Sequence, residues 1–148
     1  MSAQAHDIEY NAPKSVTTIS ANARVDYILR FSKHAVLVVD QDANVYSQVA
    51  SQFLGSLNTD HNAAFIAISP KLNDIQIRCR IVEQLFSDTL FDPEQSLAVS
   101  LINLAKPEKH AIDIVIEHAQ FLTVQILHEL CQLTDIAKKA NYAISVLM

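Results

Sequence analysis

The chain has 148 residues, a length typical of one domain and long enough to bury a core without disulfide bonds. Half of the residues are hydrophobic and 18% are charged, which predicts either a sheet covered on both faces or apolar surface that contacts a partner. The formal net charge is −5 and the longest basic run is Lys138-Lys139, so the composition argues against binding to nucleic acid.

The N-terminal half alternates between helical and extended patterns of apolar residues. Residues 1–18 show little periodicity and predict a flexible lead-in, so that a single domain occupies residues 19–148. Asn44 is the expected N-cap of the second helix, and Gly55 is expected to end it. In chain order, the expected elements are a helix over 20–31, a buried strand over 34–39, a helix over 45–54 and a strand over 63–68.

The C-terminal half continues this alternation. Asp92 is the expected cap of its second helix, with Pro93 in the first turn. Because apolar strands alternate with amphipathic helices, we expect a three-layer α/β domain, a parallel sheet with helices on both faces. A sheet that stops at its fourth strand further indicates a fragment of a longer protein. The expected elements are helices over 74–86 and 93–104, a strand over 111–116, a helix over 123–139 and a strand over 143–148.

The cysteines and the apolar runs bear on the compartment. Cys79 and Cys131 fall in helical stretches, which predicts small, buried and reduced thiols rather than a disulfide. No apolar run approaches the roughly 20 residues of a membrane span. Residues 1–20 lack the apolar centre of a signal peptide. We therefore expect a cytoplasmic domain, either free or as the cytoplasmic part of a protein anchored in the inner membrane.

Glycine is nearly absent from the sequence. Gly55 is the only one, whereas average usage predicts about ten in a chain of this length. Gly-rich phosphate loops need several glycines, because these let backbone N–H groups close around the anion. A standard loop of this kind is therefore excluded.

Ligands of open parallel sheets bind beyond the carboxyl ends of the strands, so the residues that follow the expected strands are candidates for a site. They are all polar or charged: Asp40, Gln41, Asp42, Asn44, Ser69, Glu117, His118 and Gln120. Solvated loop residues occupy such positions in any α/β protein, and this alternative stays open.

Two of these strand ends resemble the motifs of an ATPase. The strand over 34–39 is followed by DQDANVYS and a helix, like the strand, loop and helix of a P-loop ATPase, and IDIVIEHAQFL resembles a Walker B strand. With the leading segment VDYILRFSKHAVLVV, residues 20–148 are similar to the AAA-type ATPase domain of the ExeA/GspA secretion-associated family. That domain also occurs at the N-terminus of some DamX-like, SPOR-domain cell-division proteins. The resemblance implies a P-loop-NTPase-like fold and a role in cell division or secretion.

The segment that resembles a Walker A motif departs from it at nearly every functional position. Asp40 and Val45 stand where the family has glycines, and Tyr46 stands where it has lysine. Ser47, at the Mg²⁺-ligand position, fits the motif. The carboxylates of Asp40 and Asp42 would face phosphate, and two like charges a few ångströms apart repel by about 1 kcal/mol even in water. The lysine that compensates phosphate charge in the family is missing.

The Walker B-like strand end is altered as well. Glu117 stands at the position of the aspartate that organises Mg²⁺, and His118 at that of the acidic residue that activates water. Ala119 and Gln120 fit the family pattern. An imidazole can act as a base, but without a bound nucleotide His118 has no substrate, so we expect no catalytic residue, no cofactor and no metal.

Two other functions remain as alternatives. One is an active NTPase with an atypical phosphate loop. The other is a receiver-like phospho-acceptor or ligand sensor, because AVLVVDQDANV resembles the first strand of a response-regulator receiver domain. Against it, the third expected strand ends in Glu117-His118, without the phospho-accepting aspartate of that family.

The sequence therefore favours a non-catalytic, ATPase-like domain. Its expected partner is another protein or a second copy of the chain, and neither nucleic acid, ATP nor membrane insertion of this segment is expected. Structural zinc is disfavoured, since the histidines lack ligand spacing and no CxxC pair is present.

Overall fold

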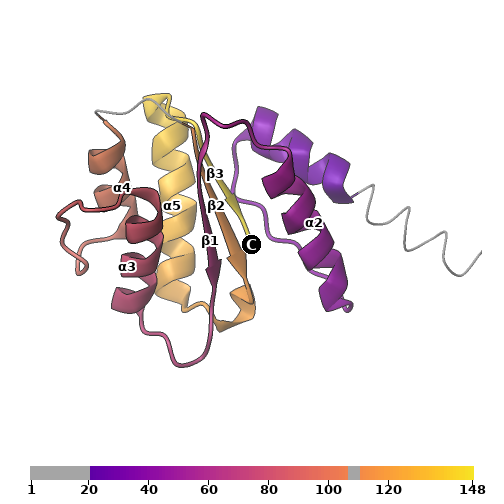
Figure 1. Ribbon diagram of the computed structural model, residues 1–148, viewed down its shortest axis with the longest axis horizontal. Coiled ribbons are helices and arrows are strands. Elements are labelled where there is room, and N and C mark those ends of the chain that lie inside the picture. Colours follow the sequence, from indigo (N-terminus) through magenta and orange to yellow (C-terminus); the bar gives the residue numbers. More distant parts are fainter. Residues whose placement is uncertain (1–20, 107–110) are drawn as a thin grey trace, which may run out of the picture.

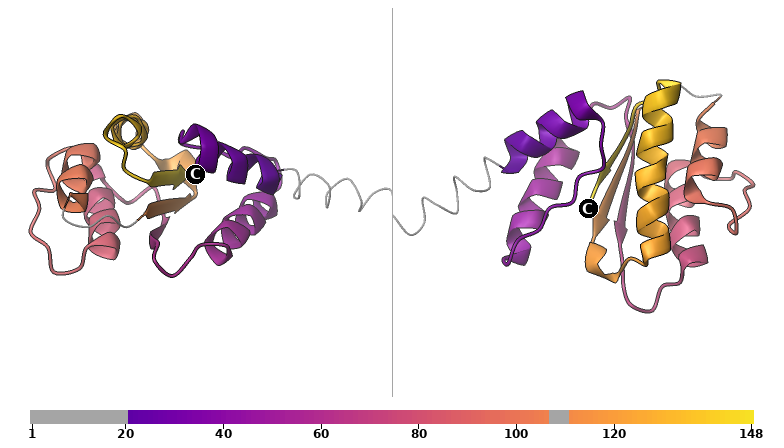
Figure 2. Two further views of the ribbon diagram at one scale, coloured as in Figure 1. Left: turned by 90° about the horizontal axis from the view of Figure 1, so that it is seen from above. Right: turned by 180° about the vertical axis from the view of Figure 1, so that it is seen from behind.

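A computed structural model describes residues 21–106 and 111–148. A parallel sheet lies between two layers of helices (Figure 1, Figure 2). The fold is therefore α/β, as the alternation of elements predicts. The predicted lead-in over 1–18 lies outside the described residues. One layer holds α3 (Asp74–Leu85), α4 (Leu97–Ala105) and α5 (Val124–Ala140), and the other holds α2 (Ala43–Gly55) and residues 21–32, of which Ile28–Ser32 form a π-helical turn.

Three strands form the sheet, β1 (Asn62–Ala67), β2 (Ile112–Glu117) and β3 (Ile144–Leu147), in the order β1-β2-β3 and all parallel. The predicted bounds of all three strands agree with these to within one residue at each end. The runs consist mostly of isoleucine, valine and alanine, which suit a buried pleated surface.

The predicted first strand, residues 34–39, lies beside β3 but is only partly a strand. Val36 forms a single parallel bridge with Leu147. The N–H of Val38 donates to the carbonyl of Met148 at 2.8 Å. The first extended segment of the chain thus pairs with the last strand, and not with β1, which follows it in sequence.

The prediction that residues 34–39 are buried is wrong for half of the segment. Leu37 is 55% exposed and Val39 is 82% exposed, whereas Val36 is buried. The segment is the edge of the sheet among the described residues, and an apolar run alone does not distinguish an edge from a central strand.

Two predicted caps differ from the structure. Asp42, and not Asn44, is the N-cap of α2, because its side chain accepts the N–H of Asn44 at 3.0 Å and the helix begins at residue 43. The helix predicted over 93–104 begins only at Leu97, where Ser96 is the cap. The residues after Asp92 form a turn instead of a first helical turn.

The core lies mainly on one face of the sheet. Seven buried residues form a smaller cluster on the other face, under α2 and residues 21–32: Val25, Leu29, Val36, Val49, Ala50, Val115 and Leu147. The main cluster, under α3, α4 and α5, includes the fully buried Ile66, Ile77, Ile114, Ile126, Leu130 and Leu133.

A buried ion pair ties the helices of the main layer together. Glu129 in α5 is fully buried and contacts Arg78 of α3, with Nε 3.1 Å from Oε1 and Nη2 3.0 Å from Oε2. The same carboxylate accepts the N–H of Leu97 at 2.8 Å, at the start of α4. Arg78 also donates to the carbonyl of Pro93 at 3.2 Å. These contacts explain why α4 begins after this turn.

Both cysteines are free thiols, but the prediction that both are buried is wrong. Cys79 is half-buried, whereas Cys131 lies on the exposed side of α5. Within residues 21–106 and 111–148, no helix combines the length and the apolar character needed to cross a membrane.

Candidate functional site

The turn between residues 34–39 and α2 is closed by its own carboxylates. Asp40 Oδ1 accepts the N–H of Asp42 at 2.8 Å, and Asp42 Oδ1 accepts the N–H of Asn44. The carbonyl of Asp42 accepts the N–H of Val45 at 3.1 Å. The amino end of a helix attracts anions through these N–H groups and the helix dipole. Here a carboxylate of the chain takes the position that a phosphate oxygen would need.

Tyr46 connects α2 to the carboxyl ends of two strands. Its hydroxyl donates to the carbonyl of Ile116 in β2 and lies 3.4 Å from the carbonyl of Leu147 in β3. Burial, and then the negative charge of Glu117, raise the pKa of the phenol above its ordinary value, although the hydrogen bond to Ile116 lowers it. Tyr46 is therefore a neutral donor at physiological pH, and it fills the space between α2 and the strand ends.

Glu117 and His118 turn the chain at the end of β2. His118 adopts a left-handed backbone with φ of 61°, which leads into a short 3₁₀ turn, Ala119–Phe121. Its Nε2 lies 3.6 Å from Glu117 Oε1. The imidazole is half exposed to solvent, while Glu117 faces a cavity beside α2.

This cavity, of about 390 Å³, lies between α2 and the part of the sheet that α2 leaves uncovered. Ala63, Phe65 and Ala67 of β1 are exposed on this face. The volume is in the range of about 300–1,000 Å³ found for small-molecule sites. Its lining is mixed, with one carboxylate among apolar and hydroxyl side chains: Tyr46, Ser47, Ala50, Ser51, Leu54, Phe65 and Glu117.

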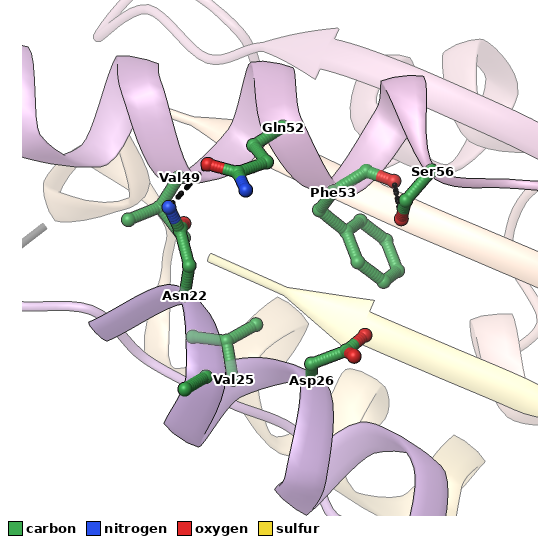
Figure 3. Close-up of a pocket in the computed structure, with 8 residues that line it drawn as sticks. Asn22, Val25, Asp26, Val49, Gln52, Phe53 and Ser56 are labelled. Carbon is green, nitrogen blue, oxygen red and sulfur yellow. Dashed lines mark hydrogen bonds between the residues drawn. The ribbon is translucent and has the colours of Figure 1, made fainter. Parts of the chain in front are cut away.

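A second cavity, of about 300 Å³, separates residues 21–32 from α2 (Figure 3). The side chains of Val25 and Phe53 point into this space, and Asn22 donates a hydrogen bond to Gln52 across it. Among the described residues that line the cavity, Asp26 contributes the one carboxylate. Nothing in the sequence patterns predicts this space, because it depends on how two helices pack.

A carboxylate–imidazole pair lies at the opposite, amino end of the sheet. Asp113 of β2 is buried, and its Oδ2 is 2.6 Å from Nδ1 of His61, which precedes β1. Burial raises the pKa of Asp113 above its ordinary value, while the hydrogen bond and the charge of His61 act in the other direction. This pair is remote from the carboxyl ends of the strands and from Tyr46.

The structure brings together only part of the predicted site. Tyr46, Ser47 and Glu117 share one cavity, whereas Asp40 and His118 do not line it. The other candidates are the exposed Gln41 and Gln120, Ser69, which accepts the N–H of Lys71 at 3.3 Å, and Asn44 and Val45 in the first turn of α2. In the part of the chain that the structure describes, no three histidine, cysteine, aspartate or glutamate side chains gather in a way that fits a metal ion.

Sequence reasoning missed Phe65 and Leu54, which form the apolar walls of the larger cavity, and the pair of His61 with Asp113. Asp113 carries a signal in the sequence, since it is the only charged residue inside the apolar run AIDIVI. A buried acid in such a run needs a partner. The identity of the partner, 52 residues away, is not contained in the pattern.

A scan against models of known protein families finds no match for this chain, and a search of curated proteins also finds none.

Proposed function

We propose that this chain is a non-catalytic, P-loop-NTPase-like domain that binds no ATP and acts as a protein-interaction module. The observation that carries the proposal is that the chain's own groups fill the place where a nucleotide phosphate would bind. Asp40 and Asp42 occupy the turn and the first N–H groups of α2, and Tyr46 occupies the strand ends.

Electrostatics supports the absence of nucleotide binding. A triphosphate at the amino end of α2 would meet the carboxylates of Asp40 and Asp42, with Glu117 beside the adjoining cavity. Among the residues that the structure describes, no lysine or arginine lines that cavity. Repulsion between unit charges 4 Å apart is about 4 kcal/mol at an effective dielectric constant of 20, and no cationic side chain among the described lining residues offsets it.

The order of the strands bears on the receiver alternative. β3 lies between residues 34–39 and β2, so that one strand separates the two segments that resemble Walker A and Walker B strands. In the flavodoxin-like order of receiver domains, the first strand lies between the second and the third. The receiver alternative therefore has less support than the ATPase-like one.

The test is a titration of the purified chain with a fluorescent ATP analogue in the presence of Mg²⁺. We expect no saturable binding up to millimolar nucleotide. Thermal unfolding gives a second readout, because a ligand at 100 times its Kd stabilises the native state by about 2.7 kcal/mol. A micromolar Kd, or a clear rise in the melting temperature with Mg²⁺ and ATP, would overturn the proposal.

Two controls sharpen this test. Mg²⁺ alone and inorganic triphosphate reveal binding that depends on charge and not on the nucleoside. Incubation with acetyl phosphate followed by intact-mass measurement addresses the receiver alternative, and a single added phosphoryl group would favour it. Cell division or secretion is the context that the family resemblance implies for the proposed interaction.

A further inference from the structure

The larger cavity is a candidate ligand site that the proposed function does not explain. It measures about 390 Å³, and the described residues that line it come from α2, β1 and the end of β2. In the order of the sheet, β1 is the strand farthest from residues 34–39. The described walls of the cavity therefore include neither β3 nor the segment that pairs with it.

The carboxylate and the phenol that line this cavity present hydrogen-bond acceptors to it. Glu117 contributes the carboxylate, and its side chain is 31% exposed. Tyr46 has a single O–H, which donates to the carbonyl of Ile116, so its oxygen can only accept from a group in the cavity. The hydroxyls of Ser47 and Ser51 can donate or accept. A ligand with several N–H donors therefore matches the lining better than one with acceptors alone.

The negative charge of Glu117 is poorly compensated by the chain. Its one ion-pair contact among the described residues is with His118, whose Nε2 lies 3.6 Å from Oε1 and whose imidazole carries a full charge only when protonated. A half-buried carboxylate attracts a cation more strongly than an exposed one, because water and salt screen it less. The net charge of −5 favours a ligand of the same sign. Charge complementarity thus selects a cation.

The apolar walls set a second requirement. Ala50, Leu54 and Phe65 line the cavity, and Phe65 is 42% exposed. Ala63 and Ala67 continue the exposed face of β1. An alkyl or aryl group that covers this surface removes apolar area from water, which favours binding. The lining therefore fits a cation that carries an apolar arm.

We propose that the larger cavity binds an organic cation, an ammonium or guanidinium group on an apolar arm, with the charge against Glu117 and the arm against Leu54 and Phe65. Free small amines carry such a group, and so do the lysine and arginine side chains of a protein partner. The inference goes beyond the proposed function. Nucleotide binding would reject the proposed function alone, whereas failure to bind organic cations would reject this site alone.

The test titrates the purified chain with three aryl ligands of similar shape and follows the backbone amide shifts by NMR. Phenethylamine is the cation, phenethyl alcohol the neutral ligand and phenylacetate the anion. We expect phenethylamine to bind saturably at millimolar concentrations, since a ligand with few atoms makes few contacts. Its Kd should be at least about tenfold lower than that of the alcohol, and phenylacetate should not bind. The shifts should centre on Ser51, Phe65 and Glu117.

Two variants separate the charge from the space. Glu117→Gln keeps the shape of the side chain but removes its charge, so the Kd of phenethylamine should rise about tenfold while that of the alcohol changes little. Ser51→Leu fills part of the cavity from an exposed position of α2 and should weaken both ligands. The matched control is Glu83→Gln, which makes the same change of net charge at an exposed position of α3, in the opposite layer. It should leave both Kd values unchanged.

A fourth probe distinguishes the two sources of the cation. N-acetylarginine amide carries a guanidinium on a peptide backbone, so binding of this probe that depends on Glu117 assigns the site to a side chain of a partner. Its absence, with phenethylamine bound, assigns the site to a free amine. Thermal unfolding verifies that each variant is folded. The proposal is overturned if neither cation binds, or if phenethylamine binds equally well to the parent and to Glu117→Gln.

Discussion

The two faces of the sheet are built differently. Under α3, α4 and α5 the main cluster is closely filled, and even its one ion pair, Arg78 with Glu129, has every buried polar atom satisfied. Under α2 and residues 21–32 the cluster is small, two cavities of about 390 and 300 Å³ flank it, and polar groups such as Tyr46 reach into the layer.

This difference separates the face that should carry most of the stability from the face that holds the cavities. A substitution lowers the free energy of unfolding most where side chains are closely packed. The main layer should therefore contribute most of the stability of the fold. The thinner layer holds the turn after residues 34–39 and the two cavities, where a side-chain substitution should cost less of the free energy of folding. Substitutions on the two faces should therefore differ in effect, from the largest at the buried ion pair to the smallest at Asp113.

The largest effect is expected at the buried ion pair. Glu129→Ala leaves Arg78 charged and buried, and it removes the acceptor for the N–H of Leu97. Breaking such a pair from one side typically costs about 3–5 kcal/mol. Urea unfolding measures this loss, with the exposed Glu83→Ala in α3 as a control within about 0.5 kcal/mol of the parent. A loss below about 1 kcal/mol in Glu129→Ala would mean that the pair does not tie the layer together.

The next prediction compares the same substitution on both faces. Leu130→Ala in the main cluster should cost about 2–5 kcal/mol, because the surrounding side chains are already close-packed. Leu54→Ala, at the wall of the larger cavity, should cost less than half as much, since Leu54 is only half-buried and borders existing space. Equal losses for the two variants, measured by urea unfolding, would remove the distinction between the faces.

Strands and helices with strong local signals were predictable from the sequence. β1, β2 and β3 agree with the prediction because continuous apolar runs of β-branched residues leave few alternatives. α5 agrees to within one residue at each end, since Thr123 is a good N-cap and the apolar residues repeat at helical spacing. These features depend only on neighbours along the chain.

The errors come from contacts between distant residues. α4 begins late because Glu129, 32 residues further on, accepts the N–H of Leu97. At the candidate site, the sequence identifies Tyr46 only as the residue that stands in place of a lysine. Its role as a donor to Ile116, 70 residues away, depends on how α2 packs on the sheet. The edge position of residues 34–39 has the same origin, since it depends on β3 at the other end of the chain.

A smaller effect is expected at Tyr46. Tyr46→Phe keeps the ring but removes the donor to the carbonyl of Ile116, and a lost hydrogen bond of this kind costs about 1 kcal/mol. The control is Tyr142→Phe, because the Tyr142 hydroxyl makes no hydrogen bond among the described residues. Thermal unfolding of the two variants should separate them. Equal stabilities would show that the Tyr46 hydroxyl does not hold α2 against the strand ends.

The smallest expected effect is a pH dependence of the free energy of unfolding, caused by the buried carboxylate of Asp113 in the thinner layer. Burial raises the pKa of Asp113 in the folded state above its ordinary value of 3.8, so the native state binds the proton more tightly than the unfolded chain does. The contribution of Asp113 to stability is therefore complete below pH 3.8 and declines as the pH rises through the folded-state pKa.

Asp113→Asn removes this titration while it keeps a polar group that can bind His61. The stability of the parent relative to Asp113→Asn should therefore fall as the pH is raised from 3.8, and become constant above the folded-state pKa. His61→Ala should extend the decline to higher pH, because His61 lowers the pKa of Asp113 through its hydrogen bond and its charge. Urea unfolding at a series of pH values measures these differences. A difference in stability between the parent and Asp113→Asn that stays constant with pH would mean that Asp113 is solvated in the native state. The face covered by α2 and residues 21–32 would then be less closely packed at this end of the sheet than its contacts indicate.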